Sequence, residues 1–161
     1  MTRRLQIMPA DEAALRVECD EIEGDLEAVR DLARDMGRLM RAGGGIGIAA
    51  PQVGATERLI VVSYACAGVK DAVDSWEAML NPQIVWASEE EEIQAEGCLS
   101  LPGRFGLVRR PKFVVVEYKS LKWASCTQEC HGLFARCVQH EMDHLDAEMI
   151  SDHWLEEIFP R

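Results

Sequence analysis

The feature that most constrains this chain is the stretch "QHEMDH", in which two histidines lie four residues apart around a glutamate. An α-helix advances about 3.6 residues per turn, so His140 and His144 would share one face and could hold one metal ion together. Glu141 would lie beside them, near enough to act on a ligand of that ion. The preceding residues 133–138 are mostly apolar, so this helix should be buried, and buried charged residues need a function.

The third protein ligand decides what such a site does, because catalytic zinc sites leave a fourth position for water. In the common zinc proteases this ligand lies downstream, at a spacing that the chain does not show. The downstream candidates are His153, Glu148, Glu156 and Glu157. Upstream, Cys98 in "AEGCLSLPG" should lie in a tight exposed turn after a strand, where its thiolate would be a soft ligand. A free cysteine is more often a small buried apolar residue, so spacing alone leaves both interpretations of Cys98 open.

The composition is that of one acidic globular domain spanning residues 1–161, with 48% hydrophobic and 28% charged residues. A net charge of -11 repels phosphate backbones, so we expect no DNA partner. No apolar run approaches the length of a membrane span, and the start "MTRRLQIMPADE" lacks the apolar core of a signal peptide. We therefore expect a cytoplasmic protein without a membrane partner.

Its six cysteines should be thiols, and Cys126 and Cys130 lack the second matching pair that a further metal site would need.

Two segments have the spacing of helices. Apolar residues recur in steps of three and four over 25–41, which predicts an amphipathic helix that "RAGGG" at 41–45 ends. A last helix should begin at Gly132 and run through Leu145. Early and late helices framing short strands predict an α+β fold, with mostly antiparallel sheets around the central C-terminal helix that carries the HExxH motif.

The strands are predicted from runs of apolar and β-branched residues. These runs are 59–64, 105–108 and 112–120. Residues 67–76 read as a polar loop. Asn81-Pro82 is a turn signal between two short strands, and the run Glu89–Glu92 is expected to be a solvated hairpin tip.

Three stretches together resemble the signature motifs of the peptide deformylase family. They are "GIGIAAPQ" at 45–52, "EGCLS" at 96–100 and "QHEMDH" at 139–144, in the family's order and at about its spacing, and "LNP" at 80–82 also fits. The resemblance implies metal-dependent removal of the formyl group from N-formylmethionine of newly synthesised polypeptides, with release of formate. The rival hypotheses are a metallopeptidase that cuts peptide bonds and a degenerate, non-catalytic relative that binds N-terminal peptides.

The first motif also matches a nucleotide-binding fingerprint, since "GIGIAA" has the pattern Gly-x-Gly-x-x-Ala. That fingerprint must follow a strand and open a helix. Here it follows a predicted helix, and Pro51 comes directly after it, so we expect no nucleotide.

The resemblance implies a role for each motif residue. The metal ligands would be Cys98, His140 and His144, with water in the fourth place. Glu141 would carry the proton, and the oxyanion would be stabilised by the side-chain amide of Gln52 and the backbone N–H of Leu99. By the same resemblance Asp143 should pair with Arg110 and hold two motifs together.

Substrate contacts are expected on both sides of the metal. The glycines around Ile46, Gly45 and Gly47, leave the backbone accessible, so an extended peptide could pair with it as an added strand. Leu133 and Cys137 precede His140 by seven and three residues on its face of the helix, and with Ile46 they could form a slot for the methionine side chain. Plain core packing is the alternative for Leu133 and Cys137.

One divalent ion is expected as cofactor. Cys-His-His alone suits Zn2+, whereas the family resemblance implies Fe2+ as the native ion, with Zn2+ or Ni2+ as substitutes. The implied partners are formyl-Met nascent peptides and, transiently, the ribosome, in a bacterial-type cytoplasm or an organelle.

Two positions differ from the family: Asp146-Ala147 stands where a glycine is common, and the end "HWLEEIFPR" is not basic, unlike the helix with which some members dock on the ribosome.

Overall fold

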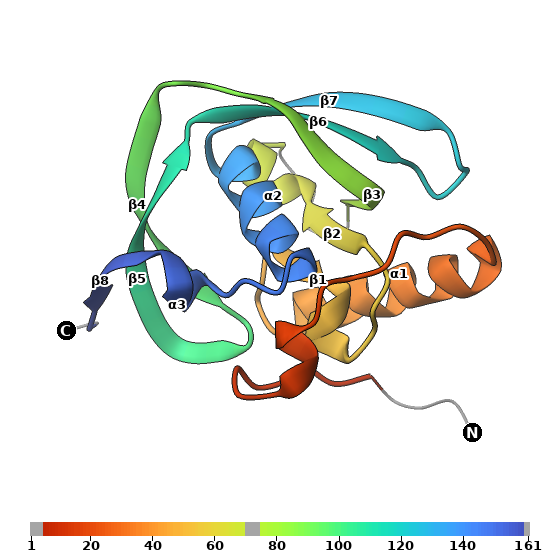
Figure 1. Cartoon of the computed structure of the whole chain (residues 1–161), viewed down its shortest axis with the longest axis horizontal. Coiled ribbons are helices and arrows are strands. Elements are labelled where there is room, and N and C mark those ends of the chain that lie inside the picture. The colour runs from red at the N-terminus through yellow and green to blue at the C-terminus, as the bar shows by residue number, and fades with distance from the viewer. Residues whose placement is uncertain (1–4, 70–74, 160–161) are drawn as a thin grey trace.

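The computed structural model describes residues 5–69 and 75–159, and Figure 1 shows how their helices and strands are arranged. The helices are η1 (Ala13–Arg16), α1 (Leu26–Ala42), η2 (Ala50–Val53), η3 (Tyr64–Ala67), α2 (Gly132–Leu145) and α3 (Ile150–His153). The strands are β1 (Gly47–Ala49), β2 (Leu59–Ser63), β3 (Trp76–Ala87), β4 (Glu91–Cys98), β5 (Leu101–Pro111), β6 (Phe113–Lys119), β7 (Ser125–His131) and β8 (Trp154–Ile158).

The strands form two sheets that curve around α2. One sheet has the order β1-β2-β3-β6-β7 and the other β4-β5-β8, and every described pair of these strands is antiparallel. In Figure 1, β3, β6 and β7 pass above α2 while β4 and β5 descend beside it. The α+β class with antiparallel sheets around the helix of the HExxH motif is confirmed.

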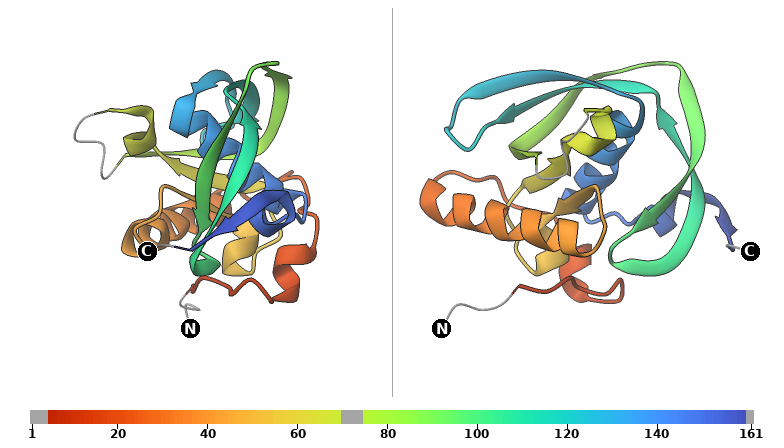
Figure 2. Two further views of the ribbon diagram at one scale, coloured as in Figure 1. Left: turned by 90° about the vertical axis from the view of Figure 1, so that its left-hand side faces the viewer. Right: turned by 180° about the vertical axis from the view of Figure 1, so that it is seen from behind.

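Strand β2 separates the two main helices, which explains why its five residues are all buried. Side chains alternate across a strand, so Ile60 and Val62 pack with α2 while Leu59 and Val61 pack on the opposite face with α1. Figure 2 shows from behind how α1 and α2 lie on either side of this strand. The buried strand gives the motif helix a rigid support.

Helix α1 agrees with the predicted amphipathic segment to within one residue at each end. The carboxylate of Asp25 accepts a hydrogen bond from the N–H of Ala28 and caps the first turn. Its apolar stripe is buried, and the helix ends at the glycines that follow Ala42. Neither α1 nor any other helix in the described ranges is long and apolar enough to cross a membrane.

Helix α2 spans the predicted residues Gly132–Leu145, and nearly all of it is buried. Phe134 and Val138 pack in one core cluster with Val114 and Val116 of β6. Burial on this scale explains why the histidines of the motif are withdrawn from bulk water.

The prediction of a turn at Asn81-Pro82 is wrong, because β3 runs through both residues as one strand. A register shift between Leu80 and Gln83 accommodates the proline, which cannot donate a ladder hydrogen bond. Asn81 adopts a left-handed conformation with φ 50°. The side-chain oxygen of Asn81 accepts a hydrogen bond from the N–H of Ile22 at 2.8 Å. The side-chain nitrogen of Asn81 donates a hydrogen bond to the C=O of Ile22 at 3.0 Å.

The acidic run Glu89–Glu92 is exposed, but the predicted hairpin is wrong. Strands β3 and β4 do not pair with each other: β3 pairs with β6 and β4 with β5, so residues 88–90 lead from one sheet to the other. Of the predicted polar loop 67–76, residues 70–74 lie outside the described residues, and Trp76 already belongs to β3.

Candidate active site

Two separate parts of the chain bring three potential metal ligands together. Cys98 ends β4, and α2 carries both histidines of the motif. The ligand atoms of Cys98, His140 and His144 all lie within 4.8 Å of one another. The Sγ of Cys98 is 3.5 Å from Nε2 of His144, and the two imidazole rings lie 5.2 Å apart.

The chemistry of this cluster fits a divalent ion. One thiol and two imidazoles form a donor set that suits zinc and similar transition metals. Burial lowers the pKa of His144, which favours the neutral imidazole that binds metals. Burial acts in the same direction on His140, but Glu141, Cys98 and Glu96 outweigh it and raise its pKa to about 10. The negative groups around His140 therefore stabilise a positive charge on this side chain, and a metal ion bound at Nε2 would supply that charge in place of the Nε2 proton.

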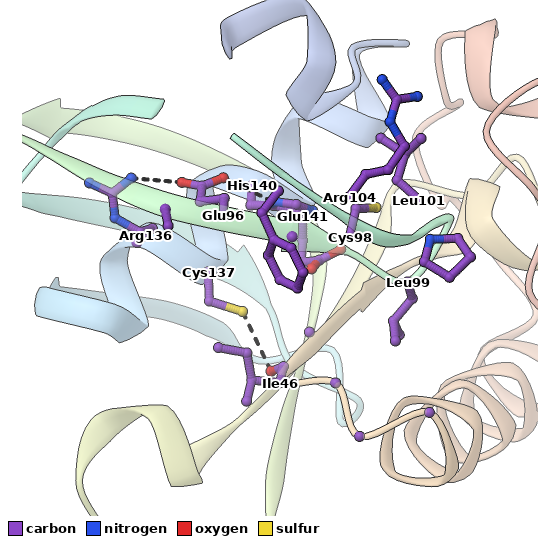
Figure 3. Close-up of a pocket in the computed structure, with 18 of the residues that line it drawn as sticks. Ile46, Glu96, Cys98, Leu99, Leu101, Arg104, Arg136, Cys137, His140 and Glu141 are labelled. Carbon is purple, nitrogen blue, oxygen red and sulfur yellow. Dashed lines mark hydrogen bonds and ion pairs between the residues drawn. The ribbon is translucent and has the colours of Figure 1, made fainter. Parts of the chain in front are cut away.

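Glu96 is a buried hub behind the ligand cluster, and Figure 3 shows its carboxylate between Arg136 and His140. It accepts hydrogen bonds from Arg110 at 2.5 and 2.9 Å, from Arg136 at 2.8 Å and from Nδ1 of His140 at 3.0 Å. Burial alone would raise the pKa of Glu96, but the bonds from His140 and Arg110 hold it well below its usual range. The ionised carboxylate holds the proton on Nδ1 and leaves Nε2 of His140 free for a metal.

Arg110 joins the second sheet to the motif helix. Besides Glu96, its guanidinium binds Asp143, with Nη1 donating to Oδ2 at 2.9 Å. Arg110 and Glu96 are 5% and 6% exposed, so the ion pair between them is shielded from water, whereas Asp143 is partly exposed. Removing one partner of a buried ion pair typically costs about 3–5 kcal/mol, which makes this junction a rigid part of the site.

Glu141 combines burial with an unused hydrogen-bonding atom. Its Oε2 has no hydrogen-bond partner among the described residues, although the side chain is buried. Burial raises the pKa of Glu141 to about 7. A carboxyl group that titrates near neutral pH can both accept and return a proton, as general acid–base catalysis requires.

The amide of Gln52 is held with its N–H groups directed at the cluster. Its Oε1 accepts a hydrogen bond from the N–H of Ala49 at 2.9 Å, which fixes the flip of the amide. Its Nε2 then donates to Sγ of Cys98 at 3.4 Å and to Oγ of Ser100 at 3.2 Å. Leu99 lies in the turn between these two residues.

A cavity of about 720 Å³ opens beside the cluster. All five residues expected from the sequence to contact substrate line it: Gly45, Ile46, Gly47, Leu133 and Cys137. Figure 3 labels two of them, Ile46 and Cys137, with the contact between the Cys137 sulfur and the Ile46 carbonyl oxygen. Leu133 is 48% exposed, so it does not belong to the closed core, whereas Cys137 is 5% exposed and contacts the carbonyl oxygen of Ile46 at 3.4 Å.

Two of the downstream candidates for a third ligand, His153 and Glu148, lie in a different cluster, and Glu156 and Glu157 of β8 belong to neither group of potential ligands among the described residues. His153 is 2.7 Å from Glu148 and 3.6 Å from Asp143, and these three form their own group of potential ligands. Among the described residues, neither potential metal group contains Cys126 or Cys130.

Several residues of the site were not assigned a role from the sequence. They are Glu96, Arg136 and Ser100 behind the ligands, and Arg104 and Phe105 on the cavity wall. Arg136 could have been found, because it precedes His140 by one helical turn in an otherwise apolar segment. Phe105 carries no such signal, since an aromatic residue in a strand is ordinary.

Comparison with known proteins agrees with this geometry. The model of the polypeptide deformylase family matches residues 4–157. Peptide deformylase 2 of Gloeobacter violaceus is 40% identical over 148 residues, covering 92% of this chain and 78% of that protein. A probable peptide deformylase from Synechococcus phage S-SSM7 superimposes with a TM-score of 0.87 at 37% identity, over 93% of this chain and 99% of the other. A peptide deformylase from Acinetobacter baumannii, solved with Met-Ala-Ser bound, gives a TM-score of 0.85 at 31% identity, over 95% and 99%. The chain therefore belongs to the polypeptide deformylase family, whose members are metal-dependent hydrolases that remove the N-formyl group from newly synthesised polypeptides.

Proposed function

We propose that this deformylase holds one divalent ion with Cys98, His140 and His144 and uses Glu141 as its proton carrier. The observation that carries the proposal is the buried, unpartnered Oε2 of Glu141 beside the three converging ligand atoms. When bound, the ion would supply an activated water and polarise the formyl oxygen. Fe2+ is the proposed native ion, with Zn2+ and Ni2+ as substitutes.

The side chains around the ion divide the remaining chemistry. Glu141 accepts the proton of the attacking water and passes it to the leaving amine, a role typically worth about 10²–10⁴-fold in rate. The amide of Gln52 and the backbone N–H of Leu99 donate hydrogen bonds to the oxyanion that forms from the formyl group. The bond between Gln52 and the N–H of Ala49 supports this role, because it fixes which end of the amide faces the site.

The substrate is proposed to bind as an extended peptide along β1. This strand is at the edge of its sheet and pairs only with β2 among the described strands, so its other side is available for an added strand. The methionine side chain would enter the cavity between Ile46, Leu133 and Cys137. The Acinetobacter baumannii enzyme with bound Met-Ala-Ser supports a peptide beginning with methionine as the ligand.

Metal content after replacement of Cys98 tests the ligand set. Cys98→Ala should lose most of the bound metal, because two histidines alone form a weak chelate. Cys126→Ala, which removes a half-buried thiol outside the cluster, is the matched control and should keep its metal. Full occupancy in Cys98→Ala would instead favour a downstream ligand such as Glu148 and the metallopeptidase hypothesis.

We further propose that residues 1–161 form one catalytic domain that acts in the cytoplasm, or in an organelle, and meets the ribosome only transiently. Three motifs from distant parts of the chain meet at one cavity, which supports the single domain. The net charge of -11 disfavours lasting attachment to ribosomal RNA. Co-sedimentation with ribosomes that carry a formyl-Met nascent chain, at low and at physiological salt, measures this contact.

A further inference from the structure

A segment outside the three motifs holds the backbone of Gln52. The N–H of Met8 donates a hydrogen bond to the carbonyl oxygen of Gln52 at 2.7 Å. Gln52 is 1% exposed, so this bond is shielded from water. The side-chain amide of Gln52 is held separately, by the N–H of Ala49. Gln52 is therefore fixed at its backbone by Met8 and at its side chain by Ala49.

The sequence around Met8 restricts how this segment can move. Met8 precedes Pro9, and a residue before proline is largely confined to extended backbone conformations. The chain then turns, with the N–H of Glu12 donating to the carbonyl oxygen of Pro9 at 3.0 Å. The helix η1 follows, and its Leu15 is fully buried. The N–H of Met8 is thus presented by a stiff segment that is anchored in the core.

The side chain of Met8 packs against both motifs that supply the proposed oxyanion donors. A Cβ added at Gly54, directly after η2, would lie 3.6 Å from Cε of Met8. Met8 and Cys98 both pack against the buried cluster that contains Leu101. The segment therefore links the turn of Gln52 to the turn that carries Cys98 and Leu99.

The neighbouring Ile7 reaches the second turn from the cavity side. It lines the cavity together with Leu99. A Cβ added at Gly43 would lie 3.0 Å from Cδ2 of Leu99 and 3.6 Å from Cδ1 of Ile7, so both side chains lie over this glycine. Ile7 and Met8 thus adjoin both residues from which the oxyanion donors are proposed to come.

We propose that Met8 is a positioning residue of the oxyanion site, whose N–H holds the backbone of Gln52 so that the side-chain amide stays directed at the ligand cluster. This inference rests on the proposed role of Gln52 as an oxyanion donor. Met8 is not among the described residues that line the cavity, so it acts through Gln52 and not on the substrate. Its effect should therefore appear in kcat, with KM almost unchanged.

The hydrogen bond acts on the donor over a short distance. Gln52 lies in η2, a single turn of four residues. Removing the N–H of Met8 would take a partner from a buried carbonyl group, and the turn would shift toward another one. The Nε2 of Gln52 is 3.4 Å from Sγ of Cys98 and 3.2 Å from Oγ of Ser100, so such a shift moves the donor relative to the cluster. A misplacement of about 1 Å can cost about 10²-fold in rate.

Met8→Pro tests the bond, because proline has no backbone N–H. Met8→Leu keeps the N–H and an apolar side chain. Gln6→Pro introduces the same ring at an exposed position and leaves the N–H of Met8 in place. Zinc content, kcat and KM for a formyl-Met peptide are measured on all three zinc-loaded variants. Met8→Pro should lower kcat by roughly 10–100-fold at unchanged KM and full zinc content, whereas the other two should keep the kcat of the unmodified sequence.

A double-mutant cycle with Gln52→Leu separates positioning from a general loss of stability. Gln52→Leu alone should lower kcat by about 10²–10³-fold, as expected for the loss of one oxyanion donor. Adding Met8→Pro to Gln52→Leu should lower kcat no further, because the effect of Met8 passes through the amide that is already absent. The same fold-loss from Met8→Pro in both backgrounds would overturn the proposal.

The other outcomes are equally distinct. A Met8→Pro variant with the kcat of Gln6→Pro, or one that loses its zinc, would also overturn the positioning role. An unchanged kcat in Gln52→Leu would reject the proposed function of Gln52 itself, whatever Met8→Pro does. If Met8→Pro fails to fold by circular dichroism, replacing the amide of Met8 by an ester, in a chain assembled by ligation at Cys19, changes only the N–H to an oxygen atom. That variant should show the same fall in kcat, and an unchanged kcat would reject the proposal.

Discussion

The carboxylate of Glu96 accepts a hydrogen bond from Nδ1 of His140 at 3.0 Å, and this bond fixes how the histidine faces the ligand cluster. Glu96 belongs to β4 and His140 to α2, so the bond also ties the second sheet to the motif helix. The strand that supplies Cys98 and the helix that supplies the histidines are thereby held in register.

Replacing Glu96 by Gln tests this link. Glutamine keeps the shape but removes the negative charge that faces two buried arginines and His140. Changing a residue that orients a metal ligand typically costs about 10–100-fold in metal affinity or activity, and we expect a loss of that size in zinc affinity. Equilibrium dialysis measures it, with the exposed Glu92→Gln on the same strand as control. Equal zinc affinity in both variants would show that the bond does not position His140.

Replacing Glu141 by Gln should leave the metal bound and abolish most turnover. The shape of the side chain is kept, but the group that carries the proton is lost, at a cost of about 10²–10⁴-fold in kcat. Metal analysis and steady-state kinetics on the same preparation separate the two effects. Near-normal kcat with full metal content would reject the proton-carrier role.

Gly47→Ala tests whether the close approach of β1 to α2 matters for activity. The new Cβ would lie 2.5 Å from both Sγ of Cys137 and Oε1 of Glu141, so a side chain of the site must move. We expect kcat/KM to fall by more than about tenfold, since small misplacements of catalytic groups have effects of this order or larger. Gly24→Ala has no atom within 4 Å of its new Cβ and is the control. Equal activity of the two variants would contradict the prediction.

The identity of the ion leads to a prediction about oxygen. Zn2+ has no redox chemistry, whereas Fe2+ beside a thiolate is exposed to oxidation, which can extend to Cys98. Protein loaded with Fe2+ under anaerobic conditions should be highly active and should lose activity in air, while the zinc form should be slower and stable. Parallel assays of both forms before and after exposure to air measure this. If the Fe2+ and Zn2+ forms are equally active and neither loses activity in air, the chain is a zinc-tolerant variant and the prediction is wrong.

The helices and the motif spacing could be predicted from sequence because both depend on local periodicity. Helix α1 and helix α2 each bury a continuous apolar stripe, and the position of His140 and His144 follows from the helical repeat. The path of β3 could not be predicted, because the proline at Asn81-Pro82 is accommodated by a register shift that depends on the partner strand. Strand β7 was not predicted, since "SCTQECH" has polar residues on both faces.

In the candidate site, too, local patterns could be predicted from the sequence, whereas contacts between distant segments could not. Ligand types and their spacing are visible in the sequence, whereas the partners of a buried charge depend on how the sheets are brought together. Glu96 lies within a recognised motif, yet its three partners come from β5 and α2.

Release of formate is the most direct measure of deformylase activity in this protein. The metal-loaded protein is given a formyl-Met peptide and, in parallel, the acetyl-Met peptide of the same sequence, and formate, acetate and internal cleavage products are measured together. We expect rapid release of formate, very slow release of acetate and intact peptide bonds, with formate release abolished in Glu141→Gln. Cleavage of internal peptide bonds, or no release of formate from a preparation with full metal content, would contradict it.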